Sequence, residues 1–105
     1  MTNYEAHIKG DFDELLDLLQ RELLKSAAES NRDEYQSGNV RCVVRVYEEY
    51  SSWRKNYAGL AIMLVENGAD LFVSAMPLGG ENMRALHRKL LDKAIKVIED
   101  YQRSL

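Results

Sequence analysis

Alternating apolar and polar positions predict a short strand at the start of the chain, followed by an amphipathic helix. Residues 3–9 place Tyr4, Ala6 and Ile8 opposite polar neighbours, which is the period-2 pattern of a strand with one wet face. Gly10 interrupts this pattern, and Asp11 stands three residues before Glu14 in the arrangement of a capped helix start. Apolar residues then recur every three or four positions and predict a helix from residue 12 to about 29. They are Phe12, Leu15, Leu16, Leu19, Leu23, Leu24 and Ala27.

The middle of the chain predicts a loop and then a second strand. Residues 30–39 are polar and rich in turn-forming types, so we expect a loop there, with a short strand at Tyr35 as a further option. Residues 40–50 alternate and are rich in β-branched side chains, which favours a strand over a helix. In this interpretation Cys42 points into the aliphatic side of the strand, whereas Arg41 and Arg45 project together from the other side.

Two further apolar runs, residues 57–65 and 71–76, flank Asn67-Gly68 and predict a hairpin. A two-residue turn at Asn67-Gly68 would fix the register of the two strands. The expected pairs are Glu66 with Ala69, Leu64 with Leu71, Ile62 with Val73, and Leu60 with Ala75. Residues 81 to about 103 carry apolar positions at helical spacing and predict a long closing helix.

These elements predict an α+β fold with the order β-α-β-β-β-α. We expect an antiparallel sheet of four strands, or five if Tyr35 lies in a strand, with both helices packed on one face. This element order resembles that of helix-grip and TBP-like folds, in which a curved antiparallel sheet holds a long C-terminal helix. The length of 105 residues fits one domain, residues 1–105.

Composition and charge exclude several classes of partner. The formal net charge is −3, which argues against a nucleic-acid binder that relies on phosphate neutralisation. The longest near-apolar run, residues 57–65, is too short for a membrane span, so no membrane partner is expected. Cys42 is the single cysteine, and the first residues lack the pattern of a secretion signal, so a cytoplasmic location is expected.

The predicted hairpin is apolar on both faces, which is unusual for an antiparallel sheet with one solvated side. One face carries Leu60, Ile62 and Leu64 and fits the helix stripes. The opposite face would pair Met63 with Phe72 and Ala61 with Ser74, and a neighbouring strand would add to it. The predicted interface or ligand face consists of Val43, Tyr47, Ala61, Met63, Val65, Phe72, Ser74 and Met76.

Three alternatives explain this second apolar face. The helices could divide between the two faces and make both of them core. The face could meet its own copy in a two-fold homodimer. It could also form a concave pocket for an apolar small molecule, or such a ligand could lie between the sheet and the last helix. We expect a non-enzymatic, homodimeric interaction or structural module, with a small-molecule carrier or sensor as the alternative.

Residues with reactive side chains do not form a recognisable catalytic or metal-binding pattern. His7 and His87 are the only histidines, and no metal-ligand spacing surrounds them. We expect His7 at the surface, and His87 at the surface or at the edge of the apolar stripe of its helix. Cys42, expected to be buried, lacks a predicted base and behaves as a small hydrophobe. No catalytic, metal or cofactor residue is therefore assigned.

Three other groups of residues are better explained by structure than by chemistry. The segment Leu78-Gly79-Gly80-Glu81 lacks the Lys-Ser/Thr of a phosphate-binding loop, so a tight connection is expected. Arg41 and Arg45, together with Arg54 and Lys55, could form a small basic rim, although solvated positions account for them equally well. Glu48 and Glu49 alternate across a strand and cannot act as a carboxylate pair.

Overall fold

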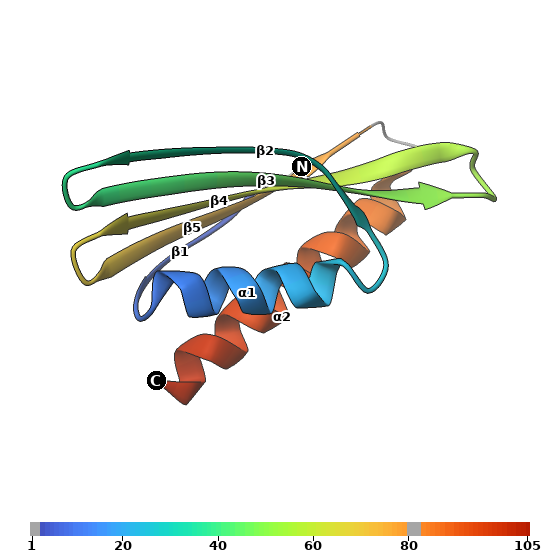
Figure 1. Cartoon of the computed structure of the whole chain (residues 1–105). Coiled ribbons are helices and arrows are strands. Elements are labelled where there is room, and N and C mark those ends of the chain that lie inside the picture. Colours follow the sequence, from blue (N-terminus) through green and yellow to red (C-terminus); the bar gives the residue numbers. More distant parts are fainter. Residues whose placement is uncertain (1–2, 80–82) are drawn as a thin grey trace.

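The computed structural model describes residues 3–79 and 83–105. Within these residues the chain forms five β-strands and two α-helices (Figure 1). The strands are β1 (Tyr4–Lys9), β2 (Ala28–Ser37), β3 (Val40–Ser51), β4 (Asn56–Asn67) and β5 (Asp70–Leu78). The helices are α1 (Phe12–Leu23) and α2 (Arg84–Ser104). The order is therefore β-α-β-β-β-β-α, with one strand more than the four that are clear in the sequence.

The strands form one antiparallel sheet in the order β1-β5-β4-β3-β2. Neighbours in this sheet are also neighbours in sequence, except for β1, which pairs with β5. Figure 1 shows both helices on the same side of the sheet, with α1 beside α2. The α+β class, the antiparallel sheet and the C-terminal helix expected from the sequence are confirmed.

Helix α1 begins where the sequence predicts and ends earlier. The Asp11 side chain accepts a hydrogen bond from the Glu14 backbone N–H at 2.8 Å, which caps the helix start. Leu15, Leu19 and Leu23 are buried on one stripe. The expected end near residue 29 is wrong, because the chain leaves the helix after Leu23 and enters β2 at residue 28.

The loop expected at residues 30–39 is wrong and the strand offered there at Tyr35 is confirmed, because most of this segment belongs to the ten-residue edge strand β2. Its residues pair with β3 from Ala28↔Glu48 to Ser37↔Val40, with one irregularity between Glu29 and Asn31. All of its side chains except that of Glu29 are exposed, so the strand leaves no apolar alternation in the sequence. Backbone pairing with β3, which side-chain patterns do not reveal, places this segment in the sheet.

The predicted hairpin between β4 and β5 exists, but its register differs by two residues. Asn67 pairs with Asp70, so the turn is Gly68-Ala69 rather than Asn67-Gly68, and Leu64 faces Val73 instead of Leu71. Gly68 has a φ of +63°, a conformation that suits glycine. A shift of two residues keeps every side chain on its expected face, because strand side chains alternate with a period of two.

The core lies between the helices and the face of the sheet that they cover, here called the inner face. On β4 and β5 its members are Leu60, Ile62, Leu64, Leu71, Val73 and Ala75, all at most 1% exposed. Tyr101 links the end of α2 to the start of α1, because its hydroxyl accepts a hydrogen bond from the backbone N–H of Asp11, the cap of α1, at 2.8 Å. In the part of the chain that the structure describes, neither helix is long and apolar enough to cross a membrane.

Candidate functional site

The face of the sheet opposite the helices, here called the outer face, carries a continuous apolar centre. Directly paired residues of antiparallel strands point to the same face, so Val44, Met63 and Ser74 form one row across β3, β4 and β5. A second row consists of Cys42, Val65 and Phe72. Both helices lie on the other side in Figure 1, and no described element covers the outer face. The apolar centre comprises Val40, Cys42, Val44, Val46, Ala61, Met63, Val65, Phe72 and Met76.

Polar residues surround this centre along the two edge strands. On the outer face, β1 presents Glu5, His7 and Lys9, whereas β2 presents Asp33 and Tyr35. The three central strands carry charged side chains on this face only near their ends, at Glu48 and Asp70. An apolar centre inside a polar rim is the usual anatomy of a protein interface.

Six of the eight residues predicted for this face lie on it, and two do not. The six are Ala61, Met63, Val65, Phe72, Ser74 and Met76. Val43 and Tyr47 face the helices instead, opposite Leu64 and Leu60, and they are 0% and 1% exposed. Burial of Tyr47 raises the pKa of its hydroxyl to about 12. Val44, Val46 and Cys42 occupy the outer positions of β3 in their place.

The two arginines of β3 explain why its faces were exchanged in the prediction. Arg41 and Arg45 suggested a wet side, but both belong to the inner face, opposite Glu66 and Ile62. The Arg41 guanidinium lies 4.2 Å from the centre of the Phe12 ring and its Nη1 is 3.0 Å from Asp13 Oδ1, so it covers the start of α1.

Arg45 is a buried partner of the edge strand rather than a solvated cation. It is 6% exposed, and its Nε is 3.5 Å from Glu29 Oε1, an ion pair without hydrogen-bond geometry. Arg54 and Lys55 are exposed in the turn between β3 and β4. The predicted basic rim of these four residues is therefore wrong, because two of its members are bound within the helix-covered side.

The predicted positions of Cys42 and His87 are also wrong. Cys42 is half-buried on the outer face instead of lying in the core, because the faces of β3 are exchanged. His87 is 1% exposed instead of lying at the surface, and neither ring nitrogen has a partner among the described residues. Its ring packs against Gly79, where a side chain would collide with it. Burial lowers the pKa of His87.

Two other expectations are confirmed in the described residues. His7 is exposed, with its ring centre 4.9 Å from that of Phe72 at the edge of the outer face. Glu48 faces outward while Glu49 faces the helices, with Glu49 Oε2 3.9 Å from Lys89 Nζ, so the two carboxylates do not meet. Gly79 has a φ of +127° at the end of the sheet, and Gly80 and Glu81 of the predicted connection lie outside the described residues.

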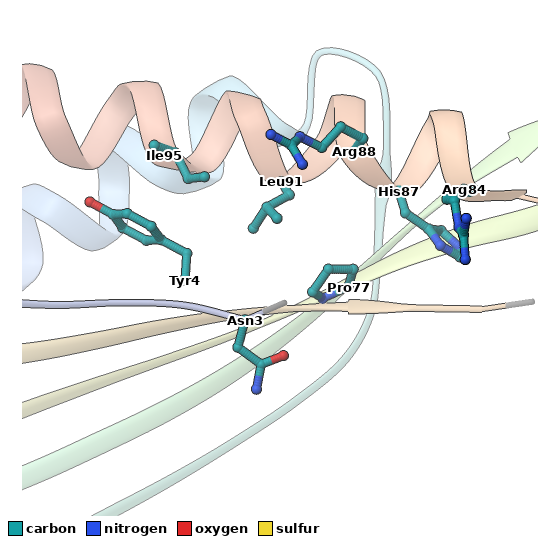
Figure 2. A pocket seen from close by; sticks show the side chains of 8 residues that line it. All are labelled: Asn3, Tyr4, Pro77, Arg84, His87, Arg88, Leu91 and Ile95. Carbon is teal, nitrogen blue, oxygen red and sulfur yellow. The ribbon is translucent and has the colours of Figure 1, made fainter. Parts of the chain in front are cut away.

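A groove of about 360 Å³ lies between α2 and the end of β1 and β5, where the sequence offered a ligand site between the sheet and the last helix without naming its residues. In Figure 2, Leu91 and Ile95 descend from α2 toward Tyr4 and Pro77 and form its apolar walls. The polar lining consists of Asn3, Arg84, His87 and Arg88. A second groove, of about 410 Å³, lies between the two helices.

Within residues 3–79 and 83–105, no group of three His, Cys, Asp or Glu side chains is placed to hold a metal ion.

Comparison with known proteins identifies a family but no activity. Neither the curated proteins nor the solved structures contain a significant match to the chain. A family model does match residues 1–101. The chain therefore belongs to DUF6054, a family of unknown function.

Proposed function

We propose that the protein is a non-enzymatic module that forms a homodimer through the outer face. The observation that carries this proposal is the uncovered apolar centre, in which three neighbouring strands present Val44, Met63 and Phe72 within a polar rim. Soluble monomers rarely expose a contiguous apolar patch of more than a few hundred Å². A second copy of the same face is the simplest cover, because a two-fold axis makes one patch serve both partners.

The dimensions of the sheet support this assembly. Five strands spaced by about 4.8 Å, with about ten residues each rising about 3.3 Å, give a face of roughly 800 Å² before the relief of the side chains is counted. A standard interface buries about 800 Å² of accessible surface on each partner, which is comparable. Two such sheets can pack at a separation of about 10 Å with their strands within about 30° of each other, as in β-sandwiches.

The test is the mass of the native particle, measured by light scattering at micromolar concentration. The wild-type chain should be a dimer, and Met63→Arg should be a folded monomer, because a charge at the centre of the apolar face would be buried without a partner. A matched control is Leu24→Arg, which places the same charge on an exposed apolar position beyond α1 and should remain dimeric.

A second outer-face variant protects this test against a folding defect. Met76 is 42% exposed, so Met76→Glu should leave the monomer folded while weakening the dimer. Circular dichroism checks that both variants keep their secondary structure. A monomeric wild type, or outer-face variants that stay fully dimeric, would contradict the proposal.

The groove between the sheet and α2 supports a second candidate function, the binding of an apolar small molecule. Its volume of about 360 Å³ lies within the usual range of ligand pockets, and four of its lining residues are Tyr4, Pro77, Leu91 and Ile95. Native mass spectrometry of freshly purified protein should then detect a retained small molecule. A protein that carries none after several expression conditions, and whose groove takes up no added apolar compound, would contradict this candidate.

A further inference from the structure

The groove beside the sheet and the groove between the helices differ in the charge of their lining. The groove beside the sheet is lined by Arg84, Arg88 and His87, and no Asp or Glu is among its described lining residues. The groove between the helices is instead lined by three carboxylates and two cations, namely Glu14, Glu22, Asp100, Arg21 and Lys25. In a chain with a net charge of −3, a lining with two arginines and no carboxylate among its described residues is a local exception.

His87 gives a second, independent indication of a polar ligand in the groove beside the sheet. Its side chain is almost completely buried at the groove wall, and neither ring nitrogen has a partner in the described part of the chain. Buried polar atoms nearly always have hydrogen-bond partners in folded proteins. His87 therefore places a buried, unsatisfied polar side chain in the groove wall, with its Nε2 turned toward Gly79.

Arg88 is the cation that is most readily available to such a ligand. Its Nε is 3.2 Å from Asp92 Oδ1, but both side chains are more than half exposed. Exposed ion pairs of this kind contribute little to stability, so the guanidinium can turn to a ligand at small cost. Figure 2 shows Arg88 beside Leu91, with His87 and then Arg84 nearer the start of α2.

We propose that this groove binds a small carboxylate with an apolar tail, the tail lying on Leu91 and Ile95 and the carboxylate facing Arg88. The apolar walls supply affinity for the tail, and the guanidinium fork selects the anion. Because the groove lies at the lower end of the usual range of pocket volumes, the tail must be short. This inference rests on the second candidate function and is independent of the homodimer.

The experiment compares sodium octanoate with 1-octanol, which has the same chain length and no charge. Two-dimensional ¹H–¹⁵N NMR of the full chain should show that octanoate shifts the backbone amides of Tyr4, Leu91 and Ile95, with much weaker binding of 1-octanol. Arg88→Glu should weaken octanoate binding about tenfold or more, as expected for the loss of a charged hydrogen bond.

Arg21→Glu is the matched control for Arg88→Glu. Arg21 also makes an exposed pair with an aspartate four residues away, at 3.0 Å from Asp17, but it lines the other groove. This variant should bind octanoate within about twofold of the wild type. Equal binding of 1-octanol and octanoate, or equal effects of the two variants, would overturn the carboxylate assignment and leave an apolar groove. No shift of the groove amides with either compound would overturn the second candidate function as well.

Discussion

The inner and outer faces of the sheet are similar in composition but differ in how they are covered. On β4, Ile62 and Leu64 are 1% and 0% exposed beneath the helices, whereas the neighbouring Met63 and Val65 are only half-buried on the open side. Both sets are apolar, so side-chain type alone does not distinguish core from surface in this protein. The difference shows that the position of the helices determines which apolar residues become core, and it leaves the outer face uncovered by any described element.

The largest expected difference between the faces is the loss of stability when a packed apolar side chain is shortened to alanine. Leu64→Ala should lower the free energy of unfolding by about 2–5 kcal/mol, because it removes buried methyl groups and leaves a cavity. Val65→Ala, one residue along on the outer face, should cost less than about 1 kcal/mol in dilute monomer. Urea denaturation at low protein concentration measures both values. Equal losses of unfolding free energy would show that the two faces are equally buried, and would contradict the difference in coverage described above.

Removing a tyrosine hydroxyl from each face should change the free energy of unfolding by a smaller amount, and on the inner face the change should have the opposite sign. The Tyr47 hydroxyl is buried on the inner face and has no hydrogen-bond partner among the described residues. Because an unsatisfied buried hydroxyl destabilises the folded state, Tyr47→Phe should raise the free energy of unfolding by about 1 kcal/mol. Tyr50→Phe, on the exposed end of the outer face, should change it by less than about 0.5 kcal/mol. If Tyr47→Phe instead lowers the free energy of unfolding, the hydroxyl stabilises the folded state and the prediction is wrong.

The two histidines should differ in how they affect the pH dependence of stability, which is the smallest of the three effects. His87 belongs to α2 on the helix-covered side, whereas His7 lies on the outer face. Burial holds the pKa of His87 below its ordinary value of 6.5, so below that pH the unfolded chain binds a proton more readily than the folded chain. The contribution of His87 to stability is therefore fully present above about pH 6.5 and declines as the pH falls toward its folded-state pKa.

Replacement of each histidine tests this pH dependence. His87→Leu should flatten the fall in unfolding free energy between pH 7 and 5, measured by urea denaturation at several pH values. His7→Gln, on the exposed outer face, should keep the wild-type profile. A wild-type slope that survives in His87→Leu would assign the pH dependence to other groups.

The sequence predicts most of the fold, since the apolar spacing that locates α1, α2 and the hairpin reflects burial against one core. For β2 it offers only a short strand at Tyr35, because an edge strand with exposed side chains is positioned by backbone hydrogen bonds. The outer positions of β4 and β5 were also predictable, because a register error of two residues leaves the faces unchanged.

The faces of β3 could not be assigned from its sequence. Both of its alternating sets contain valines, and the arginines that seemed to mark the wet side are held by contacts distant in sequence. Arg41 is held by Phe12 and Asp13 from α1, and Arg45 by Glu29 from β2. A ligand site between the sheet and the last helix was offered from the sequence, but the residues that line the groove were not, because they come from the first strand and the last helix, about 80 positions apart in the chain.

The polar edge strand β2 has a consequence for the limits of assembly. A free sheet edge can recruit further strands and grow into fibres, and natural proteins counter this with charges and bulges along the edge. Here Arg32, Asp33 and Glu34 stand in sequence on β2, and the pairing with β3 is irregular after Glu29. These features disfavour sideways addition of strands, so association through the outer face would end at two layers and would not propagate into an aggregate.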